Sequence, residues 1–211
     1  MNNQKHIQRN FLLIPFAGLV LFVMLYVIAA VLYPGGSQAD LYARGFSWMN
    51  NYWCNLLNEK AMNGEVNTAR PVAFSAMFIL CGSLALFWYQ FAGMIDFKLP
   101  ARIAIRTSGI LSMITCLFLF SKSHDTIINV SGLLASFAIA GTFAGIYKNK
   151  WSALFWFGIF NFLLIGLNNY IYYTQPLTYL PLLQKITFLS FLVWISLLIL
   201  KSYKRVEMPV K

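Results

Sequence analysis

The sequence predicts an all-α, polytopic membrane protein: a bundle of six transmembrane helices with a short interfacial helix in its first outer loop. Three observations predict this class. The 211-residue chain is 59% hydrophobic and only 10% charged, with a mean hydropathy of +0.65, whereas an ordinary soluble domain carries about 25% charged residues. Six apolar runs approach the roughly 20 residues that a spanning helix needs. Basic residues gather in the connections between those runs.

The apolar runs define the expected helices and a single transmembrane domain over residues 1–211. The first run is too long for the roughly 7–15 apolar residues of a signal peptide, so we expect a retained helix. Pro71 can open the second helix because its missing N–H costs nothing there. Residues 33–70 form the one long connection, an outer loop. The predicted helices cover residues 11–32, 71–94, 102–121, 126–147, 152–172 and 186–200.

Lysine and arginine residues predict the orientation, because their excess marks the cytoplasmic side of a membrane protein. An even number of crossings puts both termini on one side. That side holds eleven basic residues: Lys5, Arg9, Lys98, Arg102, Arg106, Lys148, Lys150, Lys201, Lys204, Arg205 and Lys211. The other side holds five: Arg44, Lys60, Arg70, Lys122 and Lys185. We therefore expect a multi-pass protein of the cell membrane with cytoplasmic N- and C-termini.

The net charge of +10 would suggest nucleic acid in a soluble protein. Here the basic residues flank apolar runs, so membrane lipids, and not nucleic acid, are the expected partners. The three cysteines are odd in number and lack paired spacing, which argues against a disulfide framework or a zinc motif. No metal or cofactor is expected.

The outer loop contains a segment with helical periodicity, residues 46–62. Its apolar side chains fall on one face, and Asn51, Asn55, Asn58 and Glu59 fall on the other. Ser47 is a suitable N-cap, and Asn63-Gly64 a suitable stop. This pattern predicts an amphipathic helix that lies in the membrane interface or folds over the bundle as a lid.

Polar side chains that could form a site gather on the predicted outer face: Asn55, Glu59, Arg70, His124, Asp125 and Asn168. His124 can donate or accept a proton near neutral pH, although a surface or interface residue is the more ordinary role. Asp125 can instead cap the fourth helix. Glu59 and Arg70 can form an ordinary salt bridge. The same groups could bind a lipid headgroup.

Small residues within the apolar runs predict close helix contacts. Gly141 and Gly145 have a G-x-x-x-G spacing, which permits two helices to approach closely. The contact could lie within the chain or in a homo-oligomer formed through these two glycines.

Three segments of the loop carry a resemblance to a known family: Tyr33-Pro34-Gly35-Gly36, the stretch from Asn51 to Asn58, and Gly64 to Pro71. They resemble a bacterial family of six-helix membrane proteins of unknown function, the DUF998-like membrane proteins. That family is similar in layout to the DRAM-type six-helix proteins of eukaryotes. The resemblance implies a six-helix fold and at most a lipid-related role, and it supplies no catalytic residues.

These observations favour a non-enzymatic membrane protein that binds or senses a lipid-like molecule at its extracytoplasmic face. Asn55, Arg70 and Asn168 are the expected ligand-binding residues. The alternative is a membrane-embedded enzyme acting on a lipid or lipid-linked substrate, with His124 as general acid or base and Asp125 or Glu59 orienting it. A small transporter is a third hypothesis, although internal repeats and midplane charges are missing from the sequence.

Overall fold

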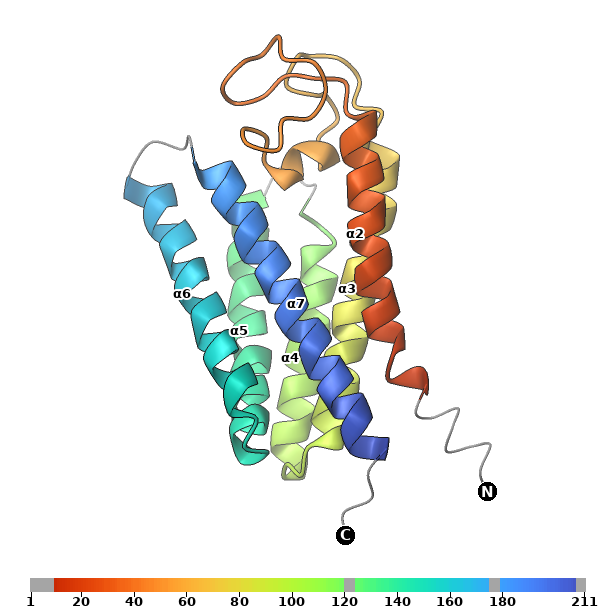
Figure 1. The fold of residues 1–211 in the computed structure, drawn as a ribbon, viewed down its shortest axis with the longest axis vertical. Helices are drawn as coiled ribbons and strands as arrows, with labels where there is room; N and C mark the ends of the chain where they lie inside the picture. Colours follow the sequence, from red (N-terminus) through yellow and green to blue (C-terminus); the bar gives the residue numbers. More distant parts are fainter. Residues whose placement is uncertain (1–9, 120–123, 175–178, 208–211) are drawn as a thin grey trace. The chain divides into compact units, whose positions relative to one another are not determined.

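The computed structural model describes residues 10–119, 124–174 and 179–207, with residues 124, 125, 206 and 207 described by their backbone alone. These residues form no strand, only two isolated β-bridges in the loop. The all-helical class is therefore confirmed. The helices are α2 (Ile14–Leu32), η1 (Trp53–Leu57, a 3₁₀-helix), α3 (Arg70–Met94), α4 (Leu99–Cys116), α5 (His124–Lys148), α6 (Ser152–Thr174) and α7 (Leu180–Glu207) (Figure 1).

Five of the six described α-helices, all except α4, are long and apolar enough to cross a membrane. Helix α4 has 18 residues and carries Arg102 and Arg106 in its first half. The third helix, predicted to continue to residue 121, ends as an α-helix at Cys116; residues 120 and 121 lie outside the described residues. After Cys116 the N–H groups of Phe118 and Leu119 bond to the carbonyls three residues earlier, at 3.0 and 3.1 Å. This tightening ends the α-helix.

Helix α7 begins at Leu180, earlier than the predicted start at residue 186. Pro181 is the second residue of the helix, a position where proline is well accommodated. Because of this earlier start, Lys185 lies inside the helix and not in the outer loop. The predicted boundary was wrong because Lys185 interrupts the apolar run and hides the first turns of the helix.

The chain divides into two compact units, each of which collects segments distant in sequence. The first unit contains Met1–Val20, Phe78–Trp156 and Trp194–Lys211. The second unit contains Leu21–Met77 and Phe157–Val193.

In the first unit, α4 and α5 pack against each other and against α3. A Cβ on Gly141 would lie 2.2 Å from Cγ1 of Ile105, and one on Gly145 would lie 2.9 Å from Cε1 of Phe91. Both glycines thus make close helix contacts within the chain. A homo-oligomer through the same two glycines stays a prediction.

In the second unit, the loop from residue 33 to 69 does not contain the amphipathic helix predicted over residues 46–62. Only the five residues of η1 are helical there. Asn51 and Asn55, predicted to face away from the apolar side, are buried, with exposed fractions of 0% and 4%. The reason is local: their side chains bond to backbone groups of the loop, which competes with helix formation.

Candidate functional site

Buried asparagine side chains hold the loop of the second unit in a single conformation. Asn51 accepts a hydrogen bond from the Ser47 N–H at 2.8 Å and donates one to the Gly36 carbonyl at 2.8 Å. Asn55 accepts from the Tyr52 N–H at 2.7 Å and from Gln38 Nε2 at 3.2 Å. The Asn55 side-chain oxygen is therefore engaged by the loop itself. Its predicted role in ligand binding stays a prediction.

Asn67 makes the largest number of these contacts. Its Nδ2 donates to the carbonyls of Asn55, Leu56 and Asn58 at 3.1, 3.2 and 2.9 Å. Its Oδ1 accepts from the Ala69 N–H at 3.1 Å. The side chain therefore joins η1 to the start of α3.

Lys185 ties the loop to α7. Its side chain is buried, with an exposed fraction of 4%. The ammonium group donates to the Asn51 carbonyl and, at 3.0 Å, to the Pro181 carbonyl one turn earlier. It also lies 5.5 Å from the ring centroid of Phe46. Burial raises the pKa of the neighbouring Cys54 thiol, so this thiol remains protonated and offers the lysine no negative charge. The ammonium group is therefore stabilised by the two carbonyl dipoles and the Phe46 ring.

The loop, α2 and α7 together enclose an apolar cavity of about 80 Å³, here called the aromatic groove. Trp53 is at its centre: its ring centroid lies 5.1 Å from those of both Tyr26 and Phe188. The Phe46 and Trp48 rings pack edge to face at 5.3 Å. The walls expose no polar surface. The lining residues are Val23, Tyr26, Val27, Ala30, Phe46, Trp48, Trp53, Leu56 and Leu189.

Sequence reasoning missed this groove. Phe46 and Trp53 belong to the apolar face of the helix predicted over residues 46–62, and the backbone is helical only over the 3₁₀-helix Trp53–Leu57. Both side chains are half-buried. The contribution of α2 and of Leu189 carries no local sequence signal. Lys185 had one usable signal, a proline four residues earlier at which a helix could begin.

Arg70 and Glu59 form the salt bridge that the sequence suggested, with Nη2 3.4 Å from Oε1. The Arg70 guanidinium also lies 5.2 Å from the ring centroid of Phe74. The Glu59 side chain is 81% exposed, so this pair adds no more than about 1 kcal/mol of stability. The carboxylate proposed to orient His124 is thus already paired with a cation.

Asn168 connects α6 to α7. Its Nδ2 donates to the Leu164 carbonyl at 2.9 Å and to the Thr187 hydroxyl. Within the described part of the chain its buried Oδ1 has no hydrogen-bond partner. Asn168, predicted to be one of the polar residues of the outer face, therefore lies in the contact between α6 and α7.

His124 and Asp125 are the first residues of α5, but their side chains lie outside the described residues. The catalytic roles assigned to them therefore stay predictions, as does the capping role of Asp125. Among the residues that the structure describes, no three His, Cys, Asp or Glu side chains are grouped so that they could hold a metal ion.

Comparison with known proteins gives no relative: no family model, curated protein or solved structure matches this chain.

Proposed function

We propose that this chain is a six-crossing protein of the cell membrane, with both termini in the cytoplasm, that binds a lipid-like molecule at its extracytoplasmic face. The observation that supports this function best is the aromatic groove, whose walls expose only apolar surface. The hydrocarbon chain of a lipid is the ligand that such walls favour, because it buries apolar area and leaves no polar group unpaired.

Large exposed apolar side chains on the helices support the proposal that the chain lies in a membrane. On α5, Leu133 and Phe137 are 64% and 61% exposed, and on α6, Phe162 and Leu163 are 62% and 67% exposed. Soluble proteins rarely expose contiguous apolar surface on this scale. Lipid tails can cover this apolar surface and keep it out of water.

Helix α4 is the proposed sixth crossing. Its 18 residues extend about 27 Å at about 1.5 Å per residue, close to the roughly 30 Å thickness of the hydrocarbon layer. Arg102 and Arg106 lie near its start, where long side chains can reach the headgroups. The Arg106 guanidinium lies 4.4 Å from the ring centroid of Tyr89, an aromatic residue suited to the interface.

Native mass spectrometry of the detergent-solubilised chain, with retained lipids identified after release, tests the binding function. Leu189→Trp adds bulk at a lining residue of the aromatic groove. Excluding about two CH₂ groups, at about 0.8 kcal/mol each, should weaken lipid retention about tenfold. Ile186→Trp is the matched control, since Ile186 lies on the same helix, is similarly exposed and does not line the groove.

The two variants should unfold at similar temperatures and differ in lipid retention. Equal retention by the wild type and both variants would remove the aromatic groove as the binding site.

A further inference from the structure

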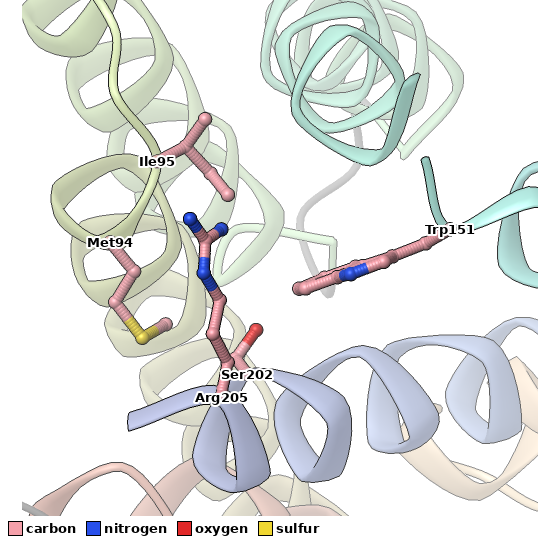
Figure 2. Close-up of a pocket in the computed structure, with 5 residues that line it drawn as sticks. All are labelled: Met94, Ile95, Trp151, Ser202 and Arg205. Atoms are coloured by element: carbon pink, nitrogen blue, oxygen red, sulfur yellow. The ribbon is translucent and has the colours of Figure 1, made fainter. Parts of the chain in front are cut away.

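A second cavity, of about 160 Å³, lies within the first unit at the ends of three helices. Met94 and Ile95 come from the end of α3, Trp151 from the turn between α5 and α6, and Ser202 and Arg205 from the last turns of α7. Figure 2 shows the Arg205 guanidinium between Ile95 and the Trp151 ring, with the Ser202 hydroxyl directed toward Trp151. We call these five residues the Arg205 pocket.

Ser202 differs from several other hydroxyl groups of the helices. Ser75, Ser83 and Thr142 donate to the carbonyl four residues earlier, at 3.0, 2.6 and 2.9 Å. The Ser202 side chain is buried, with the residue 3% exposed, and its Oγ has no hydrogen-bond partner among the described residues. A buried hydroxyl without a partner destabilises the protein, and a ligand that accepts this hydrogen bond would remove that penalty.

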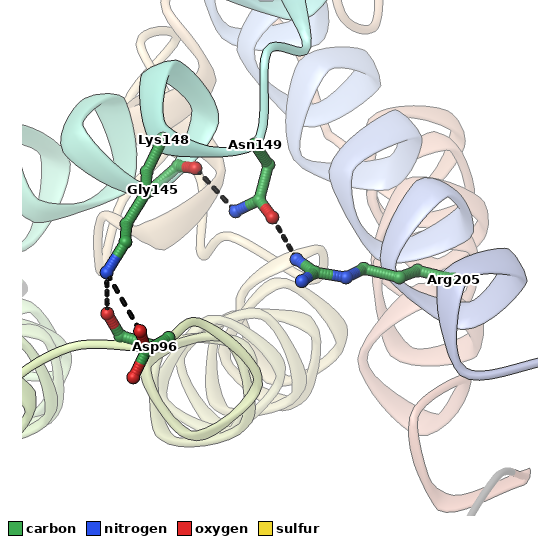
Figure 3. Close-up of polar contacts among 5 residues, drawn as sticks. All are labelled: Asp96, Gly145, Lys148, Asn149 and Arg205. Carbon is green, nitrogen blue, oxygen red and sulfur yellow. Dashed lines mark hydrogen bonds and ion pairs between the residues drawn. The ribbon is translucent and has the colours of Figure 1, made fainter. Parts of the chain in front are cut away.

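Arg205 is held at the pocket by an amide oxygen, and the side chains that the structure describes form no salt bridge with it. Its Nη1 donates to Oδ1 of Asn149, whose Nδ2 donates to the Gly145 carbonyl at 2.7 Å (Figure 3). An amide oxygen orients the guanidinium and leaves its positive charge and other donors available.

Among the side chains that the structure describes, the carboxylate next to the pocket along the chain, that of Asp96, does not oppose an anion there. Asp96 follows Ile95, and Lys148 Nζ lies 3.2 Å from its Oδ2 and also bonds to its backbone carbonyl. The exposed lysines Lys201 and Lys204 on the same helix end add further positive charge. The local potential therefore favours a negatively charged ligand.

We propose that the Arg205 pocket binds a phosphate group, supplied by a phospholipid headgroup or by free phosphate. The Arg205 guanidinium donates to two phosphate oxygens, the bidentate geometry that suits this group. The Ser202 hydroxyl donates to a third oxygen, and the Trp151 indole closes the side of the pocket. The site uses residues of the first unit only, and it does not depend on the aromatic groove.

Native mass spectrometry of the full chain in detergent tests this assignment with three probes. They are phosphatidylglycerol, a diacylglycerol with the same acyl chains and no phosphate, and inorganic phosphate followed by isothermal titration. Arg205→Gln and Ser202→Ala remove the two proposed donors. Lys204→Gln is the control, because it removes the same charge from the same helix end outside the pocket.

Arg205→Gln should weaken binding of a phosphate-bearing probe at least about tenfold, and Ser202→Ala about threefold to tenfold. Diacylglycerol should be retained poorly by every variant. If phosphatidylglycerol responds to the substitutions and inorganic phosphate does not bind, a lipid supplies the phosphate. The reverse pattern identifies free phosphate.

Three results would overturn the proposal: equal retention of phosphatidylglycerol and diacylglycerol with no binding of inorganic phosphate, equal weakening by Lys204→Gln and Arg205→Gln, or no binding of either phosphate probe. Thermal unfolding without ligand separates lost binding from lost folding. Arg205→Lys, which keeps the charge, should recover part of the affinity if the fold is intact.

Discussion

Asn67 shows what a buried amide contributes to a loop that has few regular backbone hydrogen bonds. One side chain satisfies three carbonyls and one N–H group. In a helix or sheet these groups would pair with other backbone groups. These four groups of the loop pair with a side chain instead, so a single substitution at Asn67 should have a large effect.

Asn67→Ala should lower the free energy of unfolding by about 2–4 kcal/mol, because several buried carbonyls lose their donor. Asn58→Ala is the control, since the Asn58 side chain is exposed and the Asn67 bond uses its backbone carbonyl. Thermal unfolding in detergent measures the difference. Equal stability of the two variants would show that the loop does not depend on the Asn67 amide.

The roles of individual polar residues could be predicted only in part. The Glu59–Arg70 pair was foreseen because opposite charges on one loop commonly meet. Asn51 and Lys185 were not, because their partners are backbone groups that carry no residue identity in the sequence. A buried lysine whose charge is met by the Asn51 and Pro181 carbonyls has no recognisable charge pattern.

At the level of elements, α5 contains two glycines in opposite environments. A Cβ on Gly141 would collide with Ile105 of α4, whereas a Cβ on Gly132 would meet nothing within 4 Å among the described residues. The two positions separate the packing role of a small residue from its effect on helix propensity.

Gly141→Ala should destabilise the protein by about 1–3 kcal/mol through overpacking. Gly132→Ala should be neutral or stabilise it by up to about 1 kcal/mol, since alanine favours the helix. Thermal unfolding of both variants checks the expectation, and size-exclusion chromatography with light scattering shows whether the oligomeric state changes. Greater stability of Gly141→Ala would contradict the packing described for α4 and α5.

Helices were predictable where the apolar run was long, because length and hydropathy alone determine a spanning segment. Their ends were less so: α4 ends through local i to i−3 hydrogen bonds, and α7 starts at a proline before a lysine. The prediction of a helix over residues 46–62 was wrong because hydrophobic periodicity contains no information on asparagine side chains that compete for the backbone hydrogen bonds.

For the whole molecule, the number of crossings determines which groups share a side of the membrane. With α4 included, residues 33–70 lie opposite the turn at Asn149 and Lys150. Five crossings, with α4 excluded, would put the two termini on opposite sides.

Single cysteines placed at Gln38 and Lys150 in an otherwise cysteine-free chain test this arrangement. A membrane-impermeant maleimide added to intact cells should label position 38 and should reach position 150 only after the membrane is permeabilised. Labelling of both positions in intact cells would contradict six crossings. The charge distribution predicts this orientation from the positions of lysine and arginine alone.

The Lys185 bond to Asn51 also has a consequence for biosynthesis. The two residues are 134 positions apart in the chain. At about 5–20 residues per second, the ribosome finishes Lys185 roughly ten seconds after Asn51 has been made. During that interval the loop lacks the hydrogen bond from Lys185. In nascent chains that stop before α7, the loop should therefore be exposed to proteases. The last helix thus completes the first loop, so that a protease acting on the loop would distinguish finished chains from truncated ones.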